Sequence, residues 1–258
     1  MNILVIARTT LGEALRKKIL NIFLFVALAM IIFSVSFAYF TYREELTIIK
    51  SMGLGVVAIA GMFIAIIQGI NLVPSEVERR TIYTILSKPV RRYEFLLGKY
   101  FGSLLTVLIN LVLMTVVLVT MVTWKNGWHL DLALTKGIVM IFFQLVILSA
   151  LTLVFSIFTT PVINFFLTSA VYIVGSLSDV TLSLSKGENQ NVIVKGFYWV
   201  LHYLVPQFAN FFTQNPLIHP TVVIENEAIY YAKNIIYAVI YASILLIVAI
   251  LTFEDRDM

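Results

Sequence analysis

Hydrophobic residues in this chain gather in long uncharged stretches that short charged segments separate. Residues 19–42, 51–75, 100–124, 137–178 and 234–253 contain no Asp, Glu, Lys or Arg. A helix needs about 20 apolar residues to cross a hydrocarbon core of ~30 Å. Each stretch is therefore long enough to cross a membrane.

The stretch 137–178 is about twice as long as one crossing requires. Proline disfavours helical backbone at the residue before it, so Thr160–Pro161 predicts a turn within this stretch. The sequence thus predicts six transmembrane helices in a single all-α membrane domain over 1–258. The expected spans are about 19–41, 51–73, 100–123, 136–157, 161–178 and 233–253.

Composition supports a membrane protein and excludes other classes. Hydrophobic residues make up 60% and charged residues 12%, against roughly 45–50% and ~25% in soluble domains. Too little charge remains to cover a soluble surface, which argues against a soluble enzyme or a nucleic-acid binder. The chain has no cysteine, so a disulfide framework and a Cys-ligated metal site are excluded.

Residues 196–224 are uncharged but do not have the composition of a span. They contain Pro206, Pro216 and Pro220, together with two histidines and several amides. Lipid cannot satisfy the polar groups of a broken helix. We expect re-entrant half-helices within an extracytoplasmic segment, 179–231. The alternative is a seventh span.

The first eighteen residues predict a helix at the membrane surface. At helical spacing, one face holds apolar residues (Leu4, Ala7, Leu11, Ala14 and Leu15), and Thr9, Glu13 and Arg16 lie opposite. Such a helix lies flat at the headgroups with its basic face on anionic lipid. The alternative is an ordinary basic flank of the first span.

The loop 74–99 has features of a docking element. Ser75 and Glu78 have the spacing of a capping box, which predicts a helix starting there. The helix should end near Leu86, because Pro89 breaks the pattern. The tendency of basic residues to lie on the cytoplasmic side of a membrane explains this loop's positive charge, but not its apolar residues Ile82 and Ile85. A short helix with exposed apolar side chains suggests contact with a partner.

The run EVERRTIYTILSKPVRRYEFLLGKYFG resembles the first cytoplasmic loop of type-2 ABC transporter permeases. The similarity is greatest to the subgroup often labelled copper-enzyme-maturation permeases. The matching positions are Glu78, Arg80, Thr81, Leu86, Lys88, Pro89, Val90, Arg92, Gly98, Lys99 and Gly102. The resemblance implies a permease in the cytoplasmic (inner) membrane that works with two cytoplasmic ABC ATPases. It also implies a second copy, or a homologous permease, as dimer partner, and export as the usual direction.

We expect the ATPase-coupling residues to lie in this loop: Glu76, Glu78, Arg80, Thr81, Ile82, Ile85, Leu86, Lys88, Pro89 and Arg92. The sequence has no glycine-rich phosphate loop. ATP and Mg²⁺ should therefore bind the partner ATPase, and this chain should be no enzyme and carry no cofactor. Its three histidines lack metal-ligand spacing.

Uncharged polar residues within the spans are candidates for lining a substrate path. They are Gln68, Asn71, Asn110, Gln144 and Asn164. The alternative is hydrogen bonding between helices. Two other functions remain open, an ATP-independent transporter or channel and an intramembrane enzyme. The spans show neither inverted repeats nor paired titratable residues. The substrate is not indicated.

Basic residues predict the orientation. They concentrate before the first span and in the loop 74–99: Arg8, Arg16, Lys17, Lys18, Arg79, Arg80, Lys88, Arg91, Arg92 and Lys99. Cytoplasmic segments are rich in Lys and Arg. Both termini should therefore be cytoplasmic.

Overall fold

The computed structural model describes residues 2–38, 45–75, 91–127, 129, 131–178, 196, 199, 204–211 and 226–254. The elements in these residues are all helices: α1 (Asn2–Leu15), α2 (Lys18–Ala38), α3 (Glu45–Gly69), α6 (Arg92–Lys125), α7 (Leu132–Phe158), α8 (Pro161–Ser176), η1 (Phe208–Phe211) and α12 (Glu227–Glu254). Five of them (α2, α3, α6, α7 and α12) are long and apolar enough to cross a membrane, and α8 is a shorter apolar helix. The predicted all-α membrane fold is confirmed.

Several helices extend beyond the apolar stretches that predicted them. The span expected at 51–73 is part of α3, which begins at Glu45, and the one expected at 100–123 is part of α6, which begins at Arg92. Charged residues end a hydrophobic stretch, but they do not end a helix. α6 ends where helices usually end, before a glycine with left-handed backbone, Gly127 at φ 64°.

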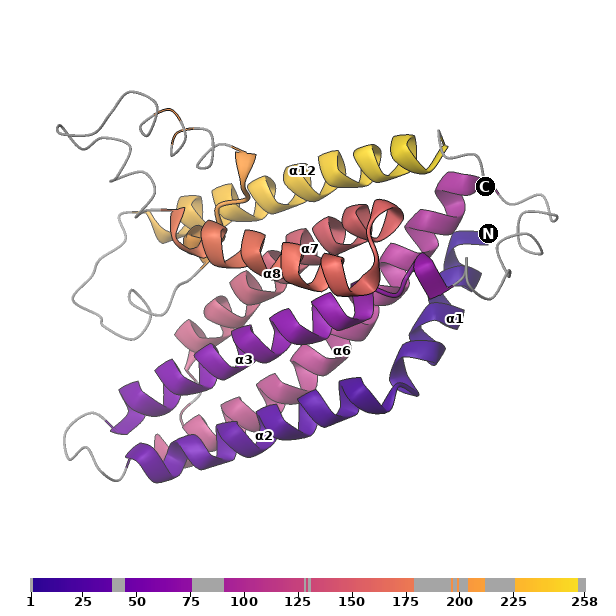
Figure 1. Cartoon of the computed structure of the whole chain (residues 1–258). Coiled ribbons are helices and arrows are strands. Elements are labelled where there is room, and N and C mark those ends of the chain that lie inside the picture. The colour runs from indigo at the N-terminus through magenta and orange to yellow at the C-terminus, as the bar shows by residue number, and fades with distance from the viewer. Residues whose placement is uncertain are drawn as a thin grey trace.

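The helices form one bundle with α7 at its centre (Figure 1). α7 contacts α3, α6, α8 and α12. In its most apolar window 78% of the residues are buried, against 17% in α12. α12 and α2 therefore turn most of their surface outward, as helices at the edge of a membrane bundle do.

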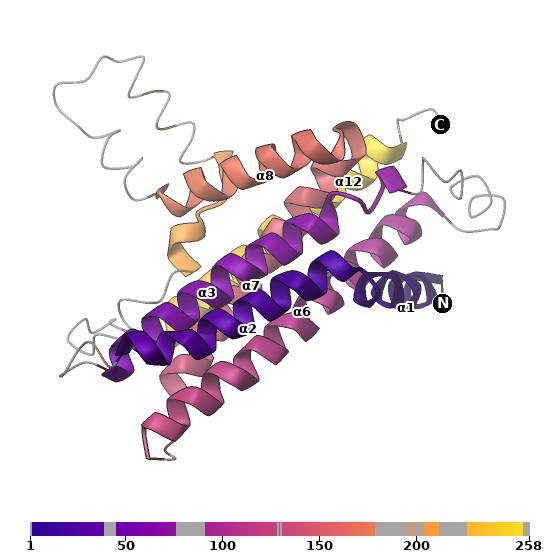
Figure 2. The same ribbon diagram turned by 60° about the horizontal axis from the view of Figure 1, so that its bottom comes forward.

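The start of α1 and the end of α12 lie at one end of the bundle (Figure 1). We call this the proximal end; it includes Ser75, the start of α6 at Arg92, and the end of α12 at Glu254. The opposite, distal end includes Glu45, Lys125, Asp131 and Glu227. Figure 2 shows α1 at the proximal end beside α6, set at an angle to α2.

The apolar side of α1 that the sequence predicted as one face is divided in the structure into a buried face and an exposed apolar face, and the polar face is a third. Ala7, Thr10 and Ala14 are buried on the side that contacts α6. Leu4 and Leu15, expected on the same face as Ala7, are 77% and 44% exposed. The small residues of α1 pack against α6, and the two leucines stay exposed. That α1 lies at the membrane surface stays a prediction.

Residues 204–211 form a short bent segment between α8 and α12. Phe208 and Phe211 are fully buried, and the Phe208 ring lies 5.2 Å from that of Tyr172 on α8. Side chains of α12 bind the backbone: the Tyr241 hydroxyl donates to Leu204 O (2.9 Å) and the Tyr230 hydroxyl to Asn210 O (2.8 Å). The other parts of the predicted re-entrant region 196–220 lie outside the described residues, apart from 196 and 199.

Candidate functional site

Most of the predicted coupling loop lies outside the described residues. This applies to nine of its ten named positions: Glu76, Glu78, Arg80, Thr81, Ile82, Ile85, Leu86, Lys88 and Pro89. The two flanks are described, and both lie at the proximal end (Figure 1). The Ser75 hydroxyl donates to the Asn71 carbonyl oxygen, within one helical turn. The chain therefore leaves the bundle after Ser75 and re-enters it at Arg91 at the same end as the start of α1 and the end of α12.

Arg92, the tenth predicted coupling residue, binds within its own chain. Its Nη1 donates to the carbonyl oxygens of Phe253 and Glu254, each at 3.1 Å. These carbonyls end α12, where a helix carries partial negative charge and lacks internal donors. The rings of Phe95 and Phe253 stack beside this contact, 6.1 Å apart. Arg92 thus joins the exit of the loop to the last span.

The start of α6 packs against the backbone of α1. A Cβ on Gly102 would lie 2.6 Å from both Ala7 O and Thr10 Cβ, and one on Gly98 would lie 2.7 Å from Ile6 Cβ. Only glycine permits such an approach. Between these two glycines lies Lys99, which is 5% exposed, with its Nζ 3.8 Å from Glu13 Oε2 of α1. The resemblance includes all three α6 positions, and the structure supplies a packing reason for each.

Four of the five amides proposed to line a path are buried within the chain: Gln68, Asn110, Gln144 and Asn164. Two of them link helices. Asn164 Nδ2 donates to Thr152 O (3.0 Å), and Gln144 Nε2 donates to the Tyr172 hydroxyl (3.2 Å), each between α7 and α8. Asn110 bonds within α6, to Thr106 O at 2.8 Å. Asn71, in the turn after α3, is half-buried. Helix-to-helix bonding thus accounts for Asn164 and Gln144, while path lining stays a prediction.

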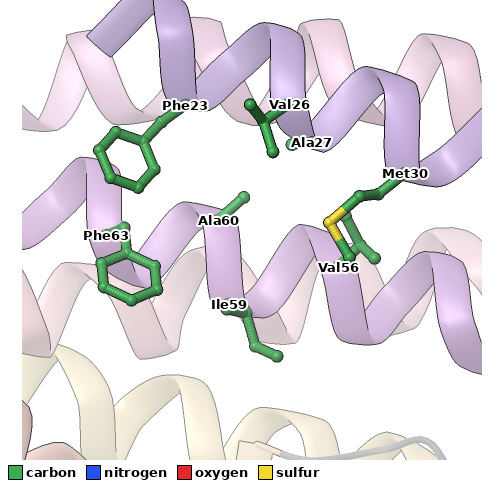
Figure 3. A pocket seen from close by; sticks show the side chains of 8 residues that line it. All are labelled: Phe23, Val26, Ala27, Met30, Val56, Ile59, Ala60 and Phe63. Atoms are coloured by element: carbon green, nitrogen blue, oxygen red, sulfur yellow. The ribbon is translucent and has the colours of Figure 1, made fainter. Parts of the chain in front are cut away.

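An apolar groove of about 160 Å³ lies between α2 and α3 (Figure 3). Its lining residues are Phe23, Val26, Ala27, Met30, Val56, Ile59, Ala60 and Phe63. These walls hold no side-chain group that could orient a polar ligand. The groove suits an acyl chain or the side of an apolar helix.

Metal-ligand side chains do not gather in the described ranges: no group of three or more His, Asp or Glu residues is found there. The charged residues of the distal end instead form pairs. Lys125 Nζ lies 3.2 Å from Glu45 Oε2, Lys136 Nζ 2.6 Å from Glu227 Oε2, and Lys50 pairs with Asp131.

The environment of Asp131 shifts its acidity. Partial burial alone would raise the pKa of its carboxyl. The hydrogen bond from Lys50, the charge of that ammonium, and the backbone N–H groups of Ala133 and Leu134 outweigh burial and hold this pKa below its usual value. Asp131 also caps α7, because its Oδ1 accepts from Ala133 N at 2.9 Å.

Comparison with protein families decides what kind of protein this bundle is. The family model described as ABC-2 family transporter protein matches residues 4–258. The chain belongs to the ABC-2 transporter family. A comparison with curated protein sequences gives no match.

Membership identifies the chain as the transmembrane permease subunit of an ABC transporter, a multi-pass membrane protein. The resemblance carried by the loop 76–102 is thereby confirmed at the level of the family. Assignment to the copper-enzyme-maturation subgroup stays a prediction. Sequence reasoning missed the Arg92 contact, because its acceptors are 161 and 162 residues away along the chain.

Proposed function

We propose that this permease works as an ATP-driven exporter whose loop 74–99 receives the motion of a separate ATPase. Family membership implies association with an ABC ATPase. The sequence lacks a phosphate-binding loop of its own. The observation that carries the proposal is that both flanks of the loop lie at the proximal end (Figure 1), where the exit flank, the start of α6, contacts α1 and the end of α12.

The proximal contacts support a transmission role. Displacement of the loop would move the start of α6, to which α1 is held by backbone contact and α12 by Arg92. In the proposed assembly two ATPases, with ATP and Mg²⁺, act on a pair of permeases in the cytoplasmic (inner) membrane. Both termini are cytoplasmic in this proposal, which accords with the basic residues of the loop.

Co-purification from the native membrane, with identification of the bound ATPase, tests the coupling. The combined change Arg80→Glu and Leu86→Ala should release the ATPase and leave the thermal unfolding midpoint of the permease unchanged. Lys233→Glu, a charge reversal at an exposed position near the distal end, is the matched control and should retain the ATPase. Retention of the ATPase and of ATP-dependent transport by the loop variant would refute the proposed role of the loop.

Cysteine labelling tests the orientation, because the native chain has no cysteine. A cysteine in place of Ser185 should react with an impermeant reagent added outside. A cysteine in place of Ser87 should react only after permeabilisation. The reverse pattern would invert the proposed topology.

A further inference from the structure

The groove between α2 and α3 exists because small side chains line its middle (Figure 3). Ala27 of α2 and Ala60 of α3 are both buried and lie between larger residues. At one end of the groove the rings of Phe23 and Phe63 stack, with their centroids 5.4 Å apart. Two alanines cannot fill the space that larger side chains would occupy, so a hollow remains between the helices.

The groove opens to the outside of the bundle. Val26, Met30 and Ile59 lie along its rim, and each is more than half exposed. Both helices are long and apolar enough to cross a membrane, so the medium outside them at this depth is hydrocarbon. An unfilled hollow loses the dispersion contacts of its lining atoms. An acyl chain of the surrounding lipid can restore these contacts from the side.

The groove lies at the depth of one leaflet. α2 begins at Lys18, directly after α1 at the proximal end (Figure 2). At the helical rise, Phe23 lies about 8 Å and Met30 about 18 Å beyond Lys18, and half of a hydrocarbon core is about 15 Å thick. Ile19, one turn before Phe23 on the same face, is exposed and extends the apolar surface toward the start of α2. The groove therefore follows the acyl chains of the proximal leaflet.

The chain before this groove is strongly basic. Residues 2–18 contain Arg8, Arg16, Lys17 and Lys18. Glu13 is the one acidic residue among them, and its Oε2 lies 3.8 Å from Lys99 Nζ. The side chains of Arg16 and Lys18 are exposed. A basic cluster beside the proximal end of an apolar groove is complementary to a molecule with an anionic head and an apolar tail.

We propose that the groove between α2 and α3 binds an acyl chain of an anionic glycerophospholipid, with the lipid phosphate at Arg16 and Lys18. Their long stems can lie along apolar surface while the charged groups reach the phosphate. Apolar contact in the groove contributes affinity, and the basic residues select the charge of the headgroup.

A second copy of this chain is a poorer occupant of the groove. A two-fold contact across this face would bring the same surface of both copies together, so two basic clusters would lie at the same depth and repel each other. The lipid site depends neither on the coupling loop nor on export.

Native mass spectrometry of the full-length permease tests the site. The protein is titrated with phosphatidylglycerol and, separately, with phosphatidylcholine of the same acyl chains. It should retain one phosphatidylglycerol per permease chain roughly tenfold more tightly than phosphatidylcholine, because two cationic side chains attract the anionic headgroup. Equal retention of the two lipids would overturn the proposed selection of the headgroup.

Filling the groove tests the site of the tail. Ala27→Leu should weaken retention of both lipids roughly tenfold or more, because several methylene groups lose their apolar contacts. Ile59→Trp fills the groove from its exposed rim, without changing the buried contact between the helices, and should have the same effect. Ala29→Leu is the matched control, since Ala29 is exposed on α2 and does not line the groove. Tight retention of phosphatidylglycerol by both filled variants would refute the site.

Neutralising the basic cluster tests the site of the headgroup. Arg16→Gln combined with Lys18→Gln should lower retention of phosphatidylglycerol to that of phosphatidylcholine and leave phosphatidylcholine unchanged. Lys233→Gln removes an exposed charge near the distal end and should preserve the preference. If Ala27→Leu instead separates a permease dimer and leaves lipid retention unchanged, the occupant is a second copy and the proposal is wrong.

Discussion

Different kinds of contact hold the helices together at the two ends of the bundle. At the proximal end, α1 meets α6 through backbone atoms at Gly98 and Gly102, and Arg92 closes the end of α12. At the distal end, three ammonium–carboxylate pairs join α3, α6, α7 and α12. Where two backbones touch, the helices cannot move without losing the contact or clashing. The ion pairs are made by partly exposed side chains that can change conformation.

This difference predicts unequal resistance to change. Partly exposed ion pairs contribute little each, commonly ~0–1 kcal/mol. Overpacking at a close backbone contact costs more, typically ~1–3 kcal/mol. The distal end can therefore exchange partners or separate readily, while α1, the start of α6 and the end of α12 should move as one body.

The largest expected effect comes from filling the α1–α6 contact. Gly102→Ala would place a Cβ against Ala7 O, so the free energy of unfolding should fall by about 1–3 kcal/mol. The loss should occur although alanine favours helix over glycine by ~1 kcal/mol. Thermal unfolding of the purified permease in nanodiscs measures it.

Gly12→Ala on α1 is the control for this change. A Cβ there meets nothing within 4 Å, so only the helical preference acts and the permease should become slightly more stable. Equal stabilisation by Gly102→Ala would show that the proximal end is not close-packed.

Removal of the Arg92 contact should have the next largest effect. Arg92→Ala deprives the Phe253 and Glu254 carbonyls of their donor, and the free energy of unfolding should fall by about 1–2 kcal/mol. Arg92→Lys keeps the charge and should recover part of the loss. The exposed neighbour Arg91 supplies a control, since Arg91→Ala should change stability less. An unchanged unfolding midpoint combined with loss of the ATPase would instead assign Arg92 to the partner contact.

Breaking a distal pair should have a smaller effect. Glu45→Gln removes the carboxylate that pairs with Lys125. Because the Glu45 side chain is 41% exposed, the free energy of unfolding should fall by no more than about 0.5 kcal/mol. High salt should reduce the difference between Glu45→Gln and the native chain. The exchanged pair, Glu45→Lys with Lys125→Glu, should restore what the single change loses. A loss as large as that of Gly102→Ala would contradict the comparison between the ends.

Acidification should affect the distal end through Asp131. Its pKa is lower in the folded protein than its usual value of ~4, so the folded state binds this proton less readily than the unfolded state does. The stabilisation is present above the usual pKa and is lost as the pH falls through the folded pKa. Unfolding midpoints measured between neutral and strongly acidic pH should show this loss in the native chain.

Asp131→Asn should show a weaker dependence on acid, because asparagine retains the helix cap without the titrating group. Lys50→Met should weaken the dependence as well. An undiminished acid effect in both variants would assign it to another carboxylate.

Hydrophobic patterning predicted the helices well because crossing a membrane is a local requirement on composition. It placed the start of α3 late, since Glu45 belongs to the helix but finds its partner, Lys125, in a distant segment. The helix that carries Arg92 into the third span was predicted, but its acceptors on α12 were not. Patterning also could not predict that α6 would take Ala7 and Ala14 of α1 and leave Leu4 exposed. That division depends on the surface of another helix.

The segment 204–211 also has a consequence for how the protein is made. Backbone groups of this bent segment form hydrogen bonds with side chains of α12. The α12 residues are Tyr230, Asn234, Tyr237 and Tyr241. These four residues are translated only after the segment 204–211. Until the last helix has entered the membrane, the carbonyls of Leu204 and Asn210 lack these donors. Biogenesis of the permease should therefore finish at its C-terminal helix, and a nascent chain stopped before Glu227 should remain a client of the insertion machinery.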